Sequence, residues 1–411
     1  MTKDELSSRL ADARHYAALA TAFALPLSTS AQAIAVSIFA VLAIVTLDRA
    51  RFEATLRMPA AWLPVALFAL IAFGTLWSVQ PTFGLAAKWI GPYAKLLLIP
   101  LVMATAITPR QALQIGYGFL AACMILLALS WASFLWPAGP WTWFKAPGVP
   151  VKDNAVQSGC FALCAFGLAF GALRIWGIDR RRAVAMGALA LLFLADVFLI
   201  YLSKTGAIMA AALLGLFLIH LGGWKRVMLV GVPAVLVIAV ALLASAPAQR
   251  RLAEIGTDIS ASQGTIAGGE TVSTGARLDF WRKAVDFVKA APLIGHGTGS
   301  IQPLYQSLEA TRPSPYGQAT PDPHNQTLHV VLQVGLIGGM LLWAMWIAHA
   351  RLFLARDMAS VFGQAIVLQN VIGGLFNSHI SAVTQGMLYC LAVGLLGAVV
   401  RLRPLTPPSS S

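Results

Sequence analysis

The sequence predicts an all-α polytopic membrane protein. Hydrophobic residues make up 58% of its 411 residues and charged residues only 11%, whereas soluble domains carry about 25% charged residues. The apolar residues come in repeated runs of about 17–22 residues, the length that an α-helix needs to cross a bilayer. The strands of a membrane β-barrel would instead alternate polar and apolar residues over about 10 positions.

Twelve apolar runs separated by polar breaks predict twelve transmembrane helices. They lie at about 16–31, 32–47, 61–77, 84–104, 111–136, 156–173, 184–202, 206–222, 227–245, 325–348, 361–379 and 382–400. The first two are short and could form a hairpin of tilted helices, and no cleavage site marks a removable signal peptide. Residues 1–245 then hold helices one to nine, 246–324 an extramembrane segment, 325–400 the last three helices, and 401–411 a disordered tail.

Positive charge supports this order of spans. If the N-terminus is cytoplasmic, every segment on the cytoplasmic side is basic, as the positive-inside rule requires, and both termini lie in the cytoplasm. The net charge of +13 is therefore explained by topology and anionic lipid rather than by nucleic acid. The residues concerned are Lys3, Arg9, Arg14, Arg49, Arg51, Arg57, Arg110, Arg174, Arg180, Arg181, Arg182, Lys225, Arg226, Arg351, Arg356, Arg401 and Arg403.

Other basic residues lie on the far side or within the spans, where topology does not explain them. Lys88 and Lys95 are seven residues apart and share one face of span four; Lys88 could snorkel to the interface, but Lys95 lies deeper. Lys204 lies in the break between spans seven and eight, where snorkelling is again the simplest explanation. No acidic residue in the neighbouring spans is an obvious partner for both Lys88 and Lys95, so an anionic ligand is the alternative.

The long far-side segment contains an amphipathic helix over 276–292, followed by a Gly-rich turn and a Pro-rich loop. We expect a small helical cap against the membrane surface. The apolar stripe comprises Leu278, Trp281, Ala284, Val285 and Val288. We expect Arg282, Lys283 and Lys289 to be solvated charges. Arg277 differs, because a cation is unfavourable at a helix start and is easier to explain if it reaches an anion.

His324 and Asn325 lie where the long far-side segment meets span ten, between Pro323 and an apolar run. The simpler interpretation is an Asn helix cap with a tolerated histidine. The functional interpretation is that the positive end of the helix dipole disfavours imidazolium, which leaves the neutral ring that a general base needs. We expect His329 to be a packing or interfacial residue, and His379 is the reserve candidate for the base.

No residue pattern in the sequence requires a metal or a cofactor. The four cysteines fall inside apolar runs and are expected to be buried spectators. The far-side carboxylates do not cluster as a divalent site, and GHGTG does not join a strand to a helix as a dinucleotide-binding loop would. We expect its glycines to shape a turn, and the tryptophans of the 136–153 loop to be interfacial anchors.

Four stretches resemble the bacterial O-antigen ligase/polymerase superfamily. HNQTLHVVLQVGLIGG carries His324, Asn325, Gly335 and Gly338, and ARLDFWRKAVDFVKAAPLIGHGTGS carries Arg277, Trp281, Pro292, Gly295 and Gly297. LWSVQPTFGLAAK resembles a further block, and SKTG has Lys204 where the family usually has Arg. The length, the twelve expected spans and the single long loop most resemble the O-antigen ligase family.

The resemblance implies an inner-membrane glycosyltransferase with a periplasmic active site and a fold similar to that of the metal-independent GT-C group. The implied donor is O-antigen on undecaprenyl pyrophosphate, and the acceptor is a sugar hydroxyl of lipid A–core. His324 is then expected to be the base of an inverting transfer, with Arg277 also catalytic. The implied pyrophosphate-binding residues are Lys204, Arg277, Lys88, Lys95 and Asn325. Lysine at 204 keeps the positive charge but lacks the planar guanidinium with which arginine binds two oxygens at once.

Three alternatives stay open on the sequence alone. An O-antigen polymerase would use the same donor with a lipid-linked acceptor, but would more often have two long far-side loops. A protein O-oligosaccharyltransferase would usually have a longer C-terminal region. A transporter of lipid-linked sugars could use cations in the membrane without any base.

Overall fold

The computed structural model describes residues 2–402 except 81, 201–202, 227, 230–273, 312 and 314–319. Its first half contains α1 (Lys3–Leu27), α2 (Thr29–Val45), α3 (Arg49–Leu56), α4 (Pro59–Phe73), η1 (Gly74–Trp77), α5 (Phe83–Ala87), α6 (Gly91–Ala94), η2 (Lys95–Leu97), α7 (Leu98–Met103), α8 (Pro109–Leu135) and α9 (Asn154–Ile175). The second half contains α10 (Arg180–Ala195), η3 (Asp196–Ile200), α11 (Lys204–Arg226), α14 (Thr274–Ala290), α15 (Ile301–Thr311), α16 (Gln326–Leu352), α17 (Met358–Gly374) and α18 (Val383–Arg401).

The protein is an all-helical membrane protein with several spans. Within the described residues, 8 helices are long and apolar enough to cross a bilayer, or 9 if α2 and α3, bent by 108°, form one span. Twelve spans were expected, and three differences account for the gap between twelve and nine. The charges in the first half of α1 make it too polar, α17 has only 17 residues, and the span expected at 227–245 lies almost wholly outside the described residues.

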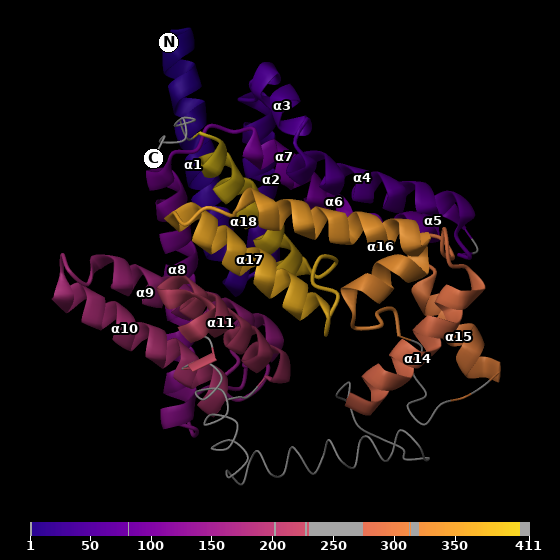
Figure 1. Cartoon of the computed structure of the whole chain (residues 1–411). Helices are drawn as coiled ribbons and strands as arrows, with labels where there is room; N and C mark the ends of the chain where they lie inside the picture. The colour runs from indigo at the N-terminus through magenta and orange to yellow at the C-terminus, as the bar shows by residue number, and fades with distance from the viewer. Residues whose placement is uncertain are drawn as a thin grey trace.

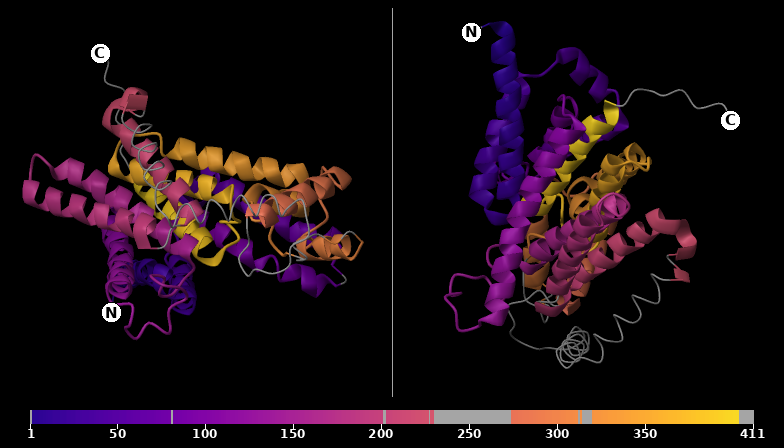
Figure 2. Two further views of the ribbon diagram at one scale, coloured as in Figure 1. Left: turned by 90° about the horizontal axis from the view of Figure 1, so that it is seen from below. Right: turned by 90° about the vertical axis from the view of Figure 1, so that its left-hand side faces the viewer.

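The helices form connected groups around several apolar clusters (Figures 1 and 2). One cluster joins α4, α7, α16, α17 and α18, a second joins α8, α9 and α10, and a third joins α1, α2, α7, α8 and α18. The start of α1, α3 and the end of α18 lie at one end of the molecule, whereas α14 and α15 lie at the other. The two ends of the bundle therefore carry different polar structures.

The helical cap expected from the sequence is present in α14 and α15, which pack on the first turns of α16. Phe280, Tyr305 and Leu332 form the centre of this contact and are almost fully buried. The expected apolar stripe was partly wrong, because Val285 is 44% exposed while Phe280 faces the core. This register places Lys283 inside the cap.

Lys283 is a correction to the sequence analysis, which expected a solvated charge. Its ammonium group is buried between Asp279, at 2.6 Å, and Glu309 of α15. An amphipathic pattern does not reveal such a pair, because Glu309 comes from the next helix. Arg282 and Lys289 are exposed, as expected.

A break in α16 is closed by the Gly-rich turn that follows α14. Gly335 has a φ of 69°, so the helix is interrupted there and leaves the carbonyls before the break without helical partners. The backbone N–H groups of His296 and Gly297 donate to the carbonyls of Leu332 and Gln333, at 2.9 and 2.8 Å. The turn thus supplies the hydrogen bonds that the helix lost.

The glycines of this junction are required by conformation and space. Gly295, Gly297 and Gly335 all have positive φ, and a Cβ on Gly335 would lie 2.0 Å from the carbonyl oxygen of Leu293. The side chains of Trp77 and Ser78 donate to backbone carbonyls of the same turn, at 3.1 and 2.7 Å. The prediction that these glycines shape a turn is confirmed, and three of the four family-like stretches meet here.

Candidate functional site

His324 lies in the turn between the cap and α16, and its backbone is held in an unusual conformation. Its φ of 54° is the left-handed region, which non-glycine residues adopt only when the surroundings fix it. Its N–H donates to the carboxylate of Asp322 at 2.8 Å, and its ring lies along that of Phe280 with centroids 6.4 Å apart. The imidazole is half-buried at the junction of the cap and the membrane helices.

Asn377, in the loop between α17 and α18, selects the tautomer of the neutral His324 ring. Nδ1 of His324 lies 2.9 Å from Oδ1 of Asn377. An amide oxygen can only accept, so Nδ1 must carry the proton and Nε2 of the neutral ring must hold the lone pair. The free lone pair is the form that a general base needs.

Asp322 ties the same loop to the turn before α16. Its Oδ1 accepts from the hydroxyl of Ser378 at 2.6 Å and contacts Nδ1 of His329 at 3.4 Å. Burial by itself would raise the pKa of this carboxyl, but the hydrogen bonds from His329 and Ser378 and the charges of His329 and His324 together lower it well below its usual range. Asp322 is therefore an anion that holds the turn in place, and His329 packs beside it.

Arg277 lies in the first turn of α14. Burial lowers the pKa of its guanidinium, and the negative charge of Asp322 partly offsets that effect. Its Nε–H is buried and has no acceptor among the described residues. A buried donor without a partner is costly, and an anionic group entering the site would satisfy it. The role of Arg277 in binding such a group stays a prediction.

Asn325 is the N-cap of α16. Its Oδ1 accepts from the N–H of Leu328 at 3.0 Å, and its amide N–H donates to the carbonyl of Leu375 at 3.0 Å. The capping interpretation is therefore confirmed. Both the oxygen and the nitrogen of its side-chain amide are therefore already hydrogen-bonded within the protein. Its contact with a pyrophosphate stays a prediction.

The three lysines predicted to bind pyrophosphate are placed differently from one another. Lys95 donates to the carbonyls of Ser381 and Ala382, at 3.2 and 2.6 Å, and so supports the loop that carries Asn377. Lys88 is exposed, with its ammonium 5.8 Å from the ring of Trp89, and the exposed Lys204 begins α11. The described hydrogen bonds thus connect His324, Asn325 and Asp322 with the 375–382 loop, and Lys95 binds the end of that loop. Arg277 is related to this group through the charge of Asp322.

Asn377, Ser378 and Asp322 were missed in the sequence as parts of the site. One signal was available in the sequence. The run FNSHIS between two apolar helices contains more polar residues than a short connecting turn needs. Only the fold reveals that this run lies against the turn before α16, more than fifty residues earlier.

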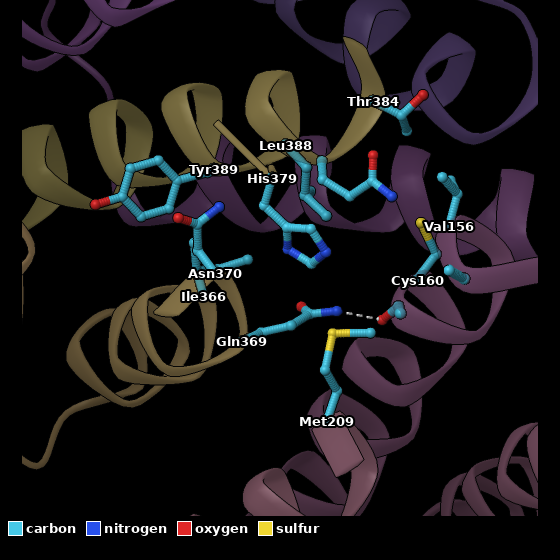
Figure 3. A pocket seen from close by; sticks show the side chains of 13 residues that line it. Val156, Cys160, Met209, Ile366, Gln369, Asn370, His379, Thr384, Leu388 and Tyr389 are labelled. Carbon is cyan, nitrogen blue, oxygen red and sulfur yellow. Dashed lines mark hydrogen bonds between the residues drawn. The ribbon is translucent and has the colours of Figure 1, made fainter. Parts of the chain in front are cut away.

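A pocket lies at the same loop, beside His379 (Figure 3). The His379 ring points toward Gln369 and Cys160, and its Nε2 has no hydrogen-bond partner among the described residues. Burial lowers the pKa of His379 to about 4, although the charge of Asp322 opposes the shift. His379 is almost fully enclosed, whereas His324 is half-buried, so accessibility favours His324 as the base.

No three His, Cys, Asp or Glu side chains lie together as a metal site in the part of the chain that the structure describes. The expectation that the protein needs no metal or cofactor stays a prediction.

The fold and the site define a polytopic membrane protein with a polar site where the cap of α14 and α15 meets the start of α16. Residues 189–343 match the family model described as O-antigen ligase. The chain thus carries the domain of a family of glycosyltransferase-type enzymes, and the resemblance found in the sequence is confirmed over this range. The matched range contains Lys204, Arg277 and His324 but ends before Asn377. No curated protein matches the chain.

Proposed function

We propose that the protein is an O-antigen ligase, which transfers a glycan from undecaprenyl pyrophosphate to a sugar hydroxyl of lipid A–core. The observation that carries this proposal is the hydrogen bond from His324 Nδ1 to Asn377 Oδ1, which leaves Nε2 as a basic nitrogen. The site would face the periplasm and both termini the cytoplasm, an orientation that the distribution of basic residues favours.

In the proposed reaction, Nε2 of His324 takes the proton of the acceptor hydroxyl as its oxygen attacks the anomeric carbon of the donor sugar. The bond between that carbon and the pyrophosphate oxygen breaks, and the pyrophosphate leaves with the electron pair. Attack opposite the leaving group inverts the anomeric centre. The proton then passes from the imidazolium to water. A general base contributes about 10²- to 10⁴-fold to such a step.

Arg277 would stabilise the charge that develops on the leaving pyrophosphate. Its Nε–H lacks an acceptor in the described structure, and a guanidinium can bind two phosphate oxygens at once. Lys204 and Lys88, whose side chains are exposed, would add positive charge farther along the lipid pyrophosphate. Lys95 would act by supporting the 375–382 loop, through its two hydrogen bonds to backbone carbonyls.

The test uses purified full-length protein with the lipid-linked glycan, lipid A–core and EDTA. We expect glycan on lipid A–core, with loss of product in Arg277→Ala and normal product in Arg282→Ala, an exposed residue on the same helix. Glycan added to a second lipid-linked glycan would indicate a polymerase, and glycan on protein an oligosaccharyltransferase. Movement of the donor across the membrane without transfer, or a requirement for divalent ion, would contradict the proposal.

A further inference from the structure

Three arginines from distant parts of the chain gather at the end of the bundle remote from the cap. Arg14 lies in α1, Arg51 in α3 and Arg401 at the end of α18, and Figure 1 shows these elements together near the start of the chain. Arg401 donates to Oγ1 of Thr55, which lies one helical turn after Arg51 in α3. Arg401 and Arg14 also donate to the carbonyls of Met103 and Ala106, which are only three residues apart. Like charges so close repel, so the arrangement needs compensating negative charge.

Part of the compensation comes from helix ends. The guanidinium of Arg14, which is buried, donates to Oγ1 of Thr46 at 2.6 Å and to the carbonyl of Ala106 at 3.2 Å. Arg401 donates to the carbonyl of Met103 at 3.3 Å. Thr46 follows α2, Met103 ends α7, and Arg401 itself lies in the last turn of α18. Three helix C-termini therefore face the cluster, each equivalent to about half a negative charge.

This compensation is incomplete. Three full positive charges against three half charges leave a surplus of about one and a half. Among the described residues, no Asp or Glu carboxylate forms an ion pair with Arg14, Arg51 or Arg401, whereas the neighbouring Arg49 is paired with Glu53 at 2.8 Å. A guanidinium has five donors, and the bonds above leave several of them available.

The space beside Arg14 is lined by two kinds of surface. A pocket there is lined by the polar residues Arg14, His15 and Gln111 and by the apolar residues Ala18, Phe39 and Ile115. A free inorganic anion would contact only the polar residues. An amphiphile with an anionic head and a hydrocarbon chain would use both.

We propose that the Arg14, Arg51 and Arg401 cluster binds the phosphodiester of an anionic phospholipid, with an acyl chain against the apolar wall beside Arg14. Arginine binds phosphate oxygens in pairs, and basic pockets between membrane helices hold lipid head groups in this way. The lipid would stabilise the junction of α1, α3, α7 and α18. The site lies away from His324 and does not depend on the proposed reaction.

Lipid binding to the full-length protein in detergent tests the proposal by thermal unfolding and native mass spectrometry. We expect phosphatidylglycerol to raise the unfolding midpoint, while phosphatidylcholine and inorganic phosphate at the same phosphate concentration do not. Arg51→Gln should weaken phosphatidylglycerol binding about fivefold, since one cation near a membrane surface contributes about 1 kcal/mol. Arg49→Gln, on the same helix but exposed and paired with Glu53, should leave the affinity unchanged.

Three outcomes would overturn the proposal. An equal rise with inorganic phosphate would mean that the cluster binds a free anion, and an equal rise with phosphatidylcholine would mean that the effect is not electrostatic. Equal affinities in Arg51→Gln and Arg49→Gln would likewise remove the cluster from lipid binding. The unmodified protein gives a further test. Its native mass spectra should show phosphatidylglycerol bound in preference to phosphatidylcholine.

Discussion

Replacement of Asn377 by alanine removes the group that orients the proposed base without removing the base itself. His324 Nδ1–H would lose its acceptor, which lies 2.9 Å away in a half-buried site. A donor left without a partner in such a place costs about 1–3 kcal/mol. If the ring orientation needed for catalysis becomes less favourable by this free energy, kcat/KM should fall about 5- to 150-fold, since 1.4 kcal/mol corresponds to tenfold.

Asn377→Asp separates orientation from a merely structural role. The carboxylate still accepts from Nδ1, so the ring keeps its orientation, but its negative charge stabilises the imidazolium. An opposite charge within about 4–6 Å favours the charged form by about 1–3 pH units. The acid limb of the kcat/KM profile should therefore move to higher pH by that amount, with activity recovered at alkaline pH.

The assay is glycan transfer by purified protein at several pH values. Ser381→Ala is the matched control, because it removes a hydroxyl that donates within the same loop, to the carbonyl of Ser378 at 3.0 Å, and leaves Asn377 in place. Its rate should stay within about twofold of the unmodified protein. Wild-type activity in Asn377→Ala, or an unshifted profile in Asn377→Asp, would refute the reasoning.

Three further predictions concern stability, measured by thermal or denaturant unfolding in detergent. Gly335→Ala should cost at least about 2 kcal/mol, because the new Cβ meets the Leu293 carbonyl oxygen and φ is positive. Lys283→Met should cost about 3–5 kcal/mol, because it leaves the Glu309 carboxylate in the cap without its cation. The buried His379, with its pKa of about 4 against 6.5 when unfolded, stays neutral on folding, so stability should fall as the pH drops from 6.5 toward 4. Between pH 7 and 5 the loss is about 2 kcal/mol, and His379→Gln should abolish it.

Local features of the site were predictable from the sequence. The start of α16 at Gln326 follows from the prolines and the Asn cap, and this placed His324 at the helix end. The glycines of the Gly-rich turn could be interpreted as turn residues because their spacing leaves no regular helix. These features depend on a few neighbouring residues, which a sequence displays directly.

Features that depend on tertiary contacts were not predictable. Asn377 lies more than fifty residues from His324, and only the packing of the α17–α18 loop against the turn before α16 brings them together. Lys283 looked solvated because its partner Glu309 belongs to another helix. Arg14 and Arg401 looked like ordinary topology signals, and only the fold brings both to carbonyls three residues apart, at Ala106 and Met103.

The central claim is that His324 is the general base of a metal-independent glycan transfer. Its most direct test is the single-turnover rate of transfer, in EDTA and across pH, for the unmodified protein and for a His324→Ala variant that inserts normally. The account predicts a rate that rises with pH through one ionisation in the unmodified protein, and a loss of about 10²- to 10⁴-fold with no such ionisation in the variant. A His324→Ala variant with the full rate and the same pH profile would contradict it.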